Sequence, residues 1–444
     1  MPTGMRVAFE AYGCTLSYGE SRRARVLAEA AGIATTDDAS AAPVVVVHTC
    51  TVIGRTERRM LRRAREVAST GRRVVLAGCL PRAQADLAAG LAREGIHVVE
   101  GQGPEDVVEA LDALMALAAL AGGALVDTAG LPPLAAHPGS QPDPALRTDA
   151  IVPIASGCLG ACSYCLTRFA WGALRSVPLQ AVVDEVRGWL SEGFREVQLT
   201  AQDTGVWGRD LDVGGHLPDL VRAVASIDPS PADWRVRVGM LNPDSLAEVL
   251  GGLSQAMLLP RVYRFAHVPV QSGSDRVLAL MRREYTAGGY ERLIEALREA
   301  VPGVTVHTDV ICGFPTETEE DFEGTLALMR RARPDVTNVK AFSARPGTAA
   351  ASMDGMVHGR VAKDRTRRAA ALAGELTRGS LEALVGKEAD VLVTEVGKGR
   401  TLMGRDIRYR PVVIPGGAGP PGVGQVARVR LAGARGVYLL GELI

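Results

Sequence analysis

The residues with the most evident chemistry are three cysteines in one short stretch, Cys158, Cys162 and Cys165. Three residues separate the first pair and two separate the second, and an apolar segment, Ile151–Ala155, precedes them. A strand would therefore lead into a small loop that can wrap a compact object. Thiolates select soft metals and iron–sulfur clusters. Three thiolates leave one iron of a four-iron cluster without a protein ligand, and such an open position can bind a substrate or cofactor.

The alternative interpretations of this loop are a zinc site and buried free thiols. Zinc requires a fourth Cys or His ligand, and none follows within the loop. The spacing C-x3-C-x2-C, with Tyr164 before the last cysteine, resembles the signature of radical S-adenosylmethionine (SAM) enzymes. The resemblance implies that the open iron binds the amino and carboxylate groups of SAM. It also implies that one electron cleaves SAM to a 5′-deoxyadenosyl radical.

Three further cysteines occupy equivalent positions in a region where strands and helices alternate. Strands are predicted at Arg6–Glu10, Val44–His48, Arg73–Ala77 and His97–Glu100. Cys14, Cys50 and Cys79 follow the first three of them. Loops that follow parallel strands emerge at one edge of the sheet, so we expect these thiols to converge on a second cluster. The alternative is three unrelated buried cysteines.

The helix predicted after Cys50 carries arginines at positions i, i+3, i+4 and i+7, which share one face. They are Arg55, Arg58, Arg59 and Arg62. This face is either a solvated surface paired with Glu57 and Glu66 or a phosphate-binding surface near the cluster edge.

A second alternating region follows, with six candidate strands. These are Ile151–Ala155, Glu196–Thr200, Arg235–Met240, Arg264–Val270, Thr305–Ile311 and Asn338–Ser343. Six strand–helix units are fewer than the eight that close a full barrel. We therefore expect an open, partial barrel, which is also the architecture that the radical-SAM resemblance implies.

Polar residues gather within or just after the carboxyl-terminal parts of these strands, where barrels of this kind perform their chemistry. They are Gln202, Asp203, Thr204, Asn242, His267, Gln271, Asp309 and Arg345. As a set, they are expected to orient the amine, ribose and adenine of SAM, although any one of them could be an ordinary loop cap. Cys312 lies near this rim without partner cysteines, and we expect it to be a small core residue.

The last part of the chain changes to short strands separated by Gly and Pro, which predicts a small antiparallel barrel. It interleaves basic and aromatic residues, either as nucleic-acid modules do or as an ordinary solvated face. These residues are Lys398, Arg400, Arg405, Arg408, Tyr409 and Arg410. The predicted domains are thus 1–125 for the N-terminal parallel α/β domain, 126–148 for a linker, 149–378 for the radical-SAM core and 384–444 for the terminal barrel.

Composition limits the class of protein. The chain has 444 residues, 47% of them hydrophobic, and a formal net charge of zero, so any RNA binding must come from local basic patches. We expect no membrane span and no signal peptide. Seven cysteines in so long a chain do not form a disulfide scaffold, and their clustering predicts metal ligation in the cytoplasm.

The whole order resembles the radical-SAM methylthiotransferases, which end in a TRAM-like barrel. Within that family, several stretches resemble the archaeal and eukaryotic branch that acts on tRNA. Those stretches are Ile154–Gly160, Leu199–Gly205, Pro269–Ser274, Asp309–Pro315 and Arg345–Thr348. The resemblance implies two [4Fe–4S] clusters, one on Cys14, Cys50 and Cys79 and the other on Cys158, Cys162 and Cys165. Ser17 and His48 stand where the family usually has Asn, and both can still form hydrogen bonds.

The branch converts N6-threonylcarbamoyladenosine at position 37 of tRNA to its 2-methylthio form. The implied partners are the tRNA anticodon loop and an electron donor of the ferredoxin or flavodoxin type, with the enzyme acting as a monomer. Two related reactions remain as alternatives, on isopentenyladenosine in tRNA or on an aspartate of a ribosomal protein. A non-catalytic iron–sulfur RNA-binding protein is the alternative from another class, and a second cluster that only relays electrons is a further one.

Overall fold

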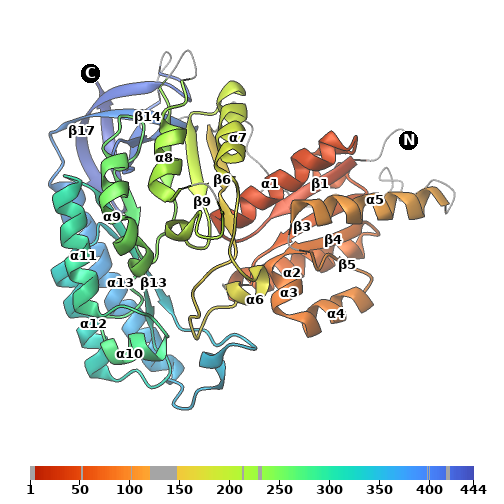
Figure 1. The fold of residues 1–444 in the computed structure, drawn as a ribbon, viewed down its shortest axis with the longest axis horizontal. Helices are drawn as coiled ribbons and strands as arrows, with labels where there is room; N and C mark the ends of the chain where they lie inside the picture. The colour runs from red at the N-terminus through yellow and green to blue at the C-terminus, as the bar shows by residue number, and fades with distance from the viewer. Residues whose placement is uncertain are drawn as a thin grey trace. The chain divides into compact units, whose positions relative to one another are not determined.

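The structure is a computed structural model that describes residues 6–51, 54–101, 103–120, 148–212, 215–228, 233–397, 399, 401–416 and 421–444. The chain forms two compact units (Figure 1). The first contains the described residues before 143 together with Ser156–Gly160 and Cys165–Leu174, and the second contains the other described residues. The boundary predicted at residue 125 and all but the last residue of the predicted linker lie outside the described ranges.

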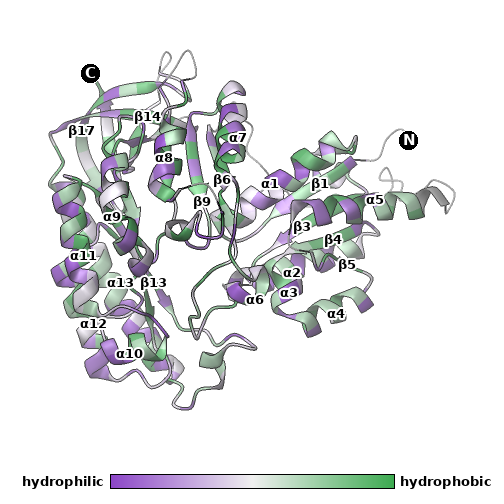
Figure 2. Ribbon diagram, in the orientation of Figure 1, coloured by the Kyte–Doolittle hydropathy of each residue, from purple (hydrophilic) through white to green (hydrophobic). Residues whose placement is uncertain are grey.

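The first unit is built on a parallel sheet of five strands in the order β2-β1-β3-β4-β5. The strands are β1 (Arg6–Ala11), β2 (Ala34–Thr36), β3 (Val44–Thr49), β4 (Arg73–Gly78) and β5 (His97–Val98). The central strands are short runs of Val, Leu and Ala that are buried on both faces, as expected for a parallel sheet. Figure 2 shows β4 largely in the hydrophobic colour.

Helices cover both faces of this sheet and bury two separate apolar clusters against it. They are α1 (Thr15–Ala30), α2 (Gly54–Ser69), α3 (Cys79–Ala83), α4 (Ala85–Arg93) and α5 (Pro104–Leu120), with a 3-10 turn η1 (Ala39–Ala41). The short helix α6 (Thr167–Trp171) also belongs to this unit and packs against α3. The predicted alternation of strands and helices is confirmed, and β2 is a short edge strand that the prediction lacked.

The second unit contains six parallel strands in two sheets of three, ordered β10-β9-β6 and β11-β12-β13. They are β6 (Asp149–Pro153), β9 (Glu196–Thr200), β10 (Arg235–Val238), β11 (Phe265–His267), β12 (Thr305–Cys312) and β13 (Val336–Ala341). Parallel bridges at Val236–Val262 and Met240–His267 join β10 to the β11 side. The predicted partial barrel of six strands is confirmed.

Helices follow the barrel strands and pack around them (Figure 1). They are α7 (Leu179–Ser191), α8 (Leu217–Ala225), α9 (Pro243–Met257), α10 (Asp275–Leu280), α11 (Ala287–Ala300), α12 (Glu319–Ala332) and α13 (Gly359–Glu382), with 3-10 turns η3 (Thr204–Val206) and η4 (Ala349–Ser352). A small pair of strands, β7 (Ala155–Ser156) and β8 (Arg175–Ser176), flanks the cysteine loop. Within the described ranges, no helix combines the length and the apolarity that crossing a membrane requires.

The chain ends in a closed five-stranded barrel in the order β14-β15-β16-β18-β17. The strands are β14 (Glu388–Val396), β15 (Leu402–Asp406), β16 (Pro411–Ile414), β17 (Val426–Arg435) and β18 (Tyr438–Leu443). Alternate residues of these strands fill one apolar core together with Leu381 and Leu384 at the end of α13. The predicted terminal barrel is confirmed.

Within the basic and aromatic stretch of this barrel, Tyr409 is buried, whereas Arg405, Arg408 and Arg410 are partly exposed. The Tyr409 ring is buried edge-on against Tyr263 and at a tilt against Phe265, and the guanidinium of Arg405 lies 4.8 Å from its centre. The Tyr409 hydroxyl donates to buried Glu196 (3.4 Å). Arg405 and Tyr409 therefore join the terminal barrel to β9 and β11, and because Tyr409 is buried, neither an RNA-binding nor a solvated surface position holds for it. Lys398 and Arg400 lie outside the described residues.

Candidate iron–sulfur sites

The first candidate site lies at the carboxyl edge of the five-stranded sheet. Ala11, His48 and Ala77 are aligned across β1, β3 and β4. Each of these three neighbouring strands is followed within three residues by one cysteine, namely Cys14, Cys50 and Cys79. Because the strands are parallel and adjacent, the register brings all three cysteine loops to one edge, as predicted.

Two glycines allow these loops to pack against one another. Gly13 has φ 121°, and a Cβ there would lie 2.5 Å from the Cβ of Cys50. Gly78 has φ 91°, and a Cβ there would lie 2.8 Å from the carbonyl oxygen of Thr49. Any other residue would push the loop away, so glycine at both positions keeps the backbones in direct contact.

Hydrogen bonds and charge also couple the three thiols. Thr49 Oγ1 donates to the carbonyl of Ala77 (2.6 Å) and accepts from the backbone N–H of Leu80 (3.0 Å), which ties the end of β3 to the loop of Cys79. Burial, followed by the charges of Cys14 and Cys50, raises the pKa of Cys79 well above its usual range. Cys165 makes a smaller contribution in the same direction. The loops thus place the Cys79 sulfur within electrostatic range of the other thiols.

Exposure differs among the three cysteines. Cys50 and Cys79 are buried, whereas Cys14 is exposed. Ser17 Oγ lies 3.6 Å from Cys14 Sγ, so this residue hydrogen-bonds a cysteine as the sequence suggested. Trp171 Nε1 donates to Cys79 Sγ (3.1 Å), a contact for which the sequence gave no signal. The exposed thiol marks the side from which this edge of the sheet is reached.

His48 lies buried beside this edge, and both of its ring nitrogens lack a protein hydrogen-bond partner. Burial lowers the pKa of His48 to about 4. A small cavity adjoins the ring, bordered by Glu20, Gly78 and Trp171 among others. His48 is capable of hydrogen bonding, but no group within the described residues pairs with its ring nitrogens.

The second candidate site is the loop of Cys158, Cys162 and Cys165. Cys158 Sγ accepts from the backbone N–H of Gly160 (3.3 Å), and Cys165 Sγ accepts from that of Thr167 (3.4 Å). Both cysteines belong to the first unit, and Cys162 belongs to the second. Backbone N–H groups aimed at sulfur stabilise the thiolate form that a cluster needs and tune its potential.

Arg283 is the residue of this site that sequence reasoning missed. Its guanidinium donates to Cys162 Sγ (3.0 Å) and to Asn242 Oδ1 (2.7 Å). Although burial opposes it, the neighbouring Tyr285, Tyr164 and Cys162 raise the pKa of Arg283, so the group is charged. Arg283 follows α10 after a left-handed residue, Arg282 (φ 57°), and no motif in the sequence marks that turn as functional.

The predicted polar rim forms a connected group around Asp203. This buried carboxylate accepts from the backbone N–H groups of Gly205 (3.0 Å) and Asn242 (3.2 Å). It also accepts from Asn242 Nδ2 (2.8 Å) and Ser245 Oγ (2.8 Å). With four protein donors in place, Asp203 fixes the position of Asn242. Asn242 Oδ1 in turn accepts a hydrogen bond from Arg283.

The other predicted rim residues fall into a second group and several separate positions. His267 Nε2 lies 2.8 Å from Asp309 Oδ2, and Asn338 Nδ2 donates to Asp309 Oδ1 (2.8 Å). Thr204 is buried and donates to the carbonyl of Met240. Gln271 adopts φ 68° and bonds through its backbone to Asp309, while Arg345 is buried after β13. Cys312 is fully buried, as expected of a core residue.

Gln202 differs from its neighbours because its side-chain amide is buried and has no protein partner for either Oε1 or Nε2. An unpaired buried amide is costly, so it is the group that a bound ligand would satisfy. Its position after β9 is where the sequence predicted a SAM contact.

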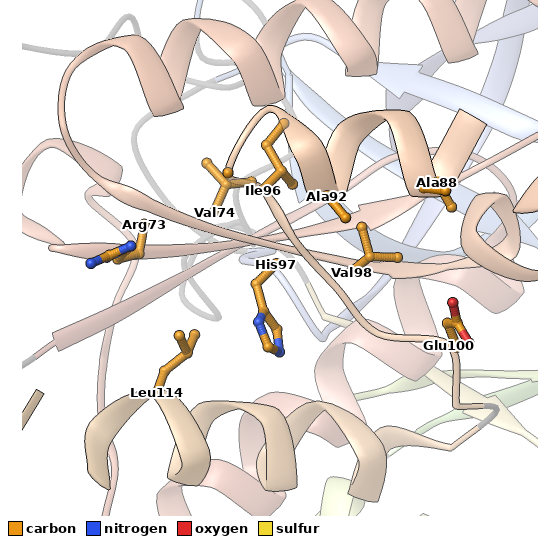
Figure 3. Close-up of a pocket in the computed structure, with 11 residues that line it drawn as sticks. Arg73, Val74, Ala88, Ala92, Ile96, His97, Val98, Glu100 and Leu114 are labelled. Carbon is orange, nitrogen blue, oxygen red and sulfur yellow. The ribbon is translucent and has the colours of Figure 1, made fainter. Parts of the chain in front are cut away.

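The described residues hold no group of three His, Cys, Asp or Glu side chains arranged around a single metal ion. A cavity of about 370 Å³ opens elsewhere in the first unit, beside the edge strand β5 and between α4 and α5 (Figure 3). Its lining includes Arg73, His97 and Glu100 but no cysteine, so it is separate from both candidate sites.

Comparison with known proteins defines the class first. Residues 152–329 match the model of the Radical SAM superfamily, residues 6–99 match Uncharacterized protein family UPF0004, and residues 382–444 match the TRAM domain. A radical SAM methyltransferase from Kitasatospora setae, TsrM, shares the fold with a TM-score of 0.54 at 16% identity, over 78% of this chain and 77% of that one. The chain is a radical SAM protein.

The particular family follows from closer relatives. A probable threonylcarbamoyladenosine tRNA methylthiotransferase of Archaeoglobus fulgidus is 37% identical over 99% of both chains. The Danio rerio threonylcarbamoyladenosine tRNA methylthiotransferase is 36% identical over 89% of this chain and 70% of its own length. The human protein of that name is 32% identical over 94% and 70%. The chain belongs to the threonylcarbamoyladenosine tRNA methylthiotransferase family.

The family uses SAM and two [4Fe–4S] clusters, and the residues present fit these groups. Each candidate site offers three thiols and leaves a fourth position to a ligand from outside. Donors point at sulfur in both sites, from Trp171 in one and from Arg283 in the other. The buried amide of Gln202 leaves polar atoms without a protein partner, which a ligand could satisfy.

Proposed function

We propose that this protein converts N6-threonylcarbamoyladenosine at position 37 of tRNA to the 2-methylthio derivative. The observation that carries the proposal is the presence of two separate three-cysteine sites in one chain. Near full-length identity to relatives named for this reaction supports it. The net change replaces the hydrogen on adenine C2 by a methylthio group.

We assign one cluster to Cys158, Cys162 and Cys165, and the other to Cys14, Cys50 and Cys79. When bound, the first would supply reductive cleavage of SAM and the second the sulfur that is transferred. Adenine C2–H is not acidic, so general acid–base catalysis offers no route to this substitution, and removal of the hydrogen requires radical chemistry.

The side chains around Cys162 position the cofactor and exclude water. In this proposal Gln202 and Asn242 contact SAM, and Asp203 acts through Asn242, because its own carboxylate is already satisfied by four donors. Arg283 holds a positive charge against Cys162 Sγ and orients Asn242 from the other side. His267, Asp309, Gln271, Thr204 and Arg345 complete the rim, with Asp309 fixed by His267 and Asn338.

The partners in this proposal are the tRNA anticodon loop and a low-potential electron donor of the ferredoxin or flavodoxin type. A single-stranded loop can present an unstacked base to a protein cavity. The terminal barrel matches the TRAM domain and is the module we assign to tRNA binding. We place the enzyme in the cytoplasm, where thiols remain reduced, and expect it to act as a monomer.

Nucleoside mass spectrometry of tRNA tests the proposal. Reconstituted protein, SAM, a reductant and tRNA bearing threonylcarbamoyladenosine should yield its 2-methylthio form. A methylthio product only on isopentenyladenosine, or only on a ribosomal-protein aspartate, would move the chain to a related reaction. Absence of 5′-deoxyadenosine with reduced, iron-loaded protein would make it a non-catalytic RNA-binding protein.

A further inference from the structure

Helix α2 carries six arginines, and four of them lie on one exposed face. This arginine face consists of Arg55, Arg58, Arg59 and Arg62. Their spacing places them along one side of the helix over about 10 Å, from the rise of about 1.5 Å per residue. The two remaining arginines, Arg63 and Arg65, point elsewhere.

The arginine face is not neutralised by the protein. Within the described ranges, Arg55, Arg58 and Arg62 form no ion pair, and the Arg59 guanidinium lies 5.4 Å from the centre of the Tyr12 ring. By contrast, buried Arg63 is paired with Glu10, and Arg65 makes two hydrogen bonds to Glu94 (2.7 and 2.9 Å). The face is therefore the unpaired side of a helix whose other arginines have carboxylate partners.

Glu57 and Glu66, the two glutamates that could balance the charge of this face, both bind other side chains. Glu57 Oε2 accepts from Thr51 Oγ1 (2.8 Å) and from Gln84 Nε2 (2.6 Å). Glu66 is paired with Arg63 (3.1 Å). Like charges at i, i+3 and i+4 disfavour the helix. The observed arrangement thus keeps mutually repulsive positive charges exposed, as expected of a surface that binds an anion from outside the protein.

The position of the face links it to the cysteine edge of the sheet. Helix α2 begins at Gly54, close after Cys50 in the chain. Arg59 lies over Tyr12, which leads directly through Gly13 to Cys14. The arginine face therefore lies near the edge at which Cys14 is exposed.

A row of separated guanidinium groups suits a polyanion with regularly spaced charges better than a single small anion. Arginine binds phosphate in a bidentate manner, and phosphate contacts position a nucleic acid without reading its sequence. The chain has no net charge to attract RNA as a whole, so a local patch must do so.

We propose that the arginine face binds the phosphodiester backbone of the tRNA substrate and guides the anticodon loop toward the edge formed by Cys14, Cys50 and Cys79. This inference rests on the proposed function for the identity of the RNA. It assigns part of tRNA binding to the N-terminal α/β domain, in addition to the terminal barrel.

The test is salt-dependent binding of a fluorescein-labelled tRNA anticodon stem–loop to iron-loaded protein. Each phosphate contact contributes about 0.7 to the slope of log Kd against log salt for single strands. The variant Arg55→Gln, Arg58→Gln, Arg62→Gln should lose about 2 from the slope and bind about a hundredfold more weakly at about 0.1 M salt. Arg59 is left in place because it packs on Tyr12.

Two matched variants control for charge and helix. Arg65→Gln removes an exposed arginine of the same helix that is paired with Glu94, and should leave slope and affinity close to wild type. Replacing Arg55, Arg58 and Arg62 by Lys should retain most of the slope. Should the triple Gln variant lose iron or helicity, the single Gln variants are measured instead, each expected to lower the slope by about 0.7.

An unchanged slope in the triple Gln variant, or an equal loss in Arg65→Gln, would overturn the inference. The result is separable from the proposed function. If the wild-type protein makes the methylthio nucleoside and the triple variant binds tRNA normally, only the inference about the arginine face is wrong. If the wild-type protein makes no such nucleoside yet binds RNA through this face, only the proposed function is wrong.

Discussion

The two sets of three cysteines are assembled in opposite ways. One set occupies a single loop of eight residues, Cys158–Cys165, whereas the other is spread from Cys14 to Cys79 and comes together only through the register of β1, β3 and β4. The first needs only one short loop, and the second needs a sheet with glycines at positions 13 and 78 that let the loops touch. Equivalent ligand sets can thus be encoded by local spacing or by topology.

The groups around the sulfurs differ as well. Cys79 Sγ accepts a hydrogen bond from neutral Trp171, while Cys162 Sγ accepts from the charged guanidinium of Arg283. A nearby positive charge stabilises the reduced form of a cluster more than a neutral donor does. The comparison therefore predicts different roles for the two centres, and the following substitutions probe it in order of expected effect.

The largest effect should come from removing each cysteine set. Replacing Cys158, Cys162 and Cys165 by Ala should abolish both 5′-deoxyadenosine release and methylthiolation, because SAM loses its cluster. Replacing Cys14, Cys50 and Cys79 should abolish methylthiolation but leave 5′-deoxyadenosine release measurable by liquid chromatography. Equal loss of both products in the two variants would show that the two cysteine sets do not have separate roles. Methylthiolation that survives loss of Cys14, Cys50 and Cys79 would show that their cluster is not the source of the transferred sulfur.

Changing Asp203, which positions Asn242 at the loop site, should have the next largest effect. Asp203→Asn places an amide N–H₂ among four donors, and we expect it to cost about 1–3 kcal/mol of unfolding free energy. SAM should bind about tenfold more weakly, because Asn242 loses its orientation. Ser245→Ala removes only one donor and should cost less. Chemical denaturation and SAM titration measure both effects, and wild-type SAM affinity in Asp203→Asn would contradict the positioning role.

Arg283 allows a test of charge at the loop site. In protein lacking Cys14, Cys50 and Cys79, Arg283→Gln should shift the reduction potential of the remaining cluster negative by tens of millivolts. The sign follows because reduction adds negative charge that the guanidinium stabilises. Arg283→Lys should shift it less. Redox titration followed by electron paramagnetic resonance measures the potential, and an unchanged value in Arg283→Gln would refute the charge argument.

The smallest effect should come from Trp171→Phe, which keeps the ring packed against Leu16 and Ala170 but removes the donor to Cys79. A neutral hydrogen bond contributes about 1 kcal/mol, so iron should be lost about fivefold faster to a chelator. The measurement uses protein lacking Cys158, Cys162 and Cys165. Trp234→Phe is the matched control, because its buried Nε1–H has no acceptor in the described structure. Equal rates for the two variants would show that the bond to Cys79 has no effect.

Much of this organisation could be predicted from the sequence because it depends on local pattern. Runs such as Val44–Val47 predict buried parallel strands, and the positions of Cys14, Cys50 and Cys79 after strands then predict their convergence. The six-stranded partial barrel and the terminal barrel follow from the same alternation of strands, helices and turns.

The failures arise where tertiary packing decides. Arg283 reaches Cys162 across a long stretch of chain and through the left-handed turn at Arg282, and nothing local predicts either. Arg405 and Tyr409 have the composition of an RNA-binding surface, but buried Glu196 and Phe265 draw them inward. A basic and aromatic pattern does not distinguish these outcomes. The SAM contacts of Gln202 and Asn242 stay predictions.

The central claim is that each cysteine set holds its own four-iron cluster. The most direct test is iron and sulfide analysis of anaerobically reconstituted protein and of the variant with Cys14, Cys50 and Cys79 replaced by Ala. We predict about eight iron atoms per chain in the wild type and about four in the variant. About four in the wild type, or an unchanged content in the variant, would contradict the account.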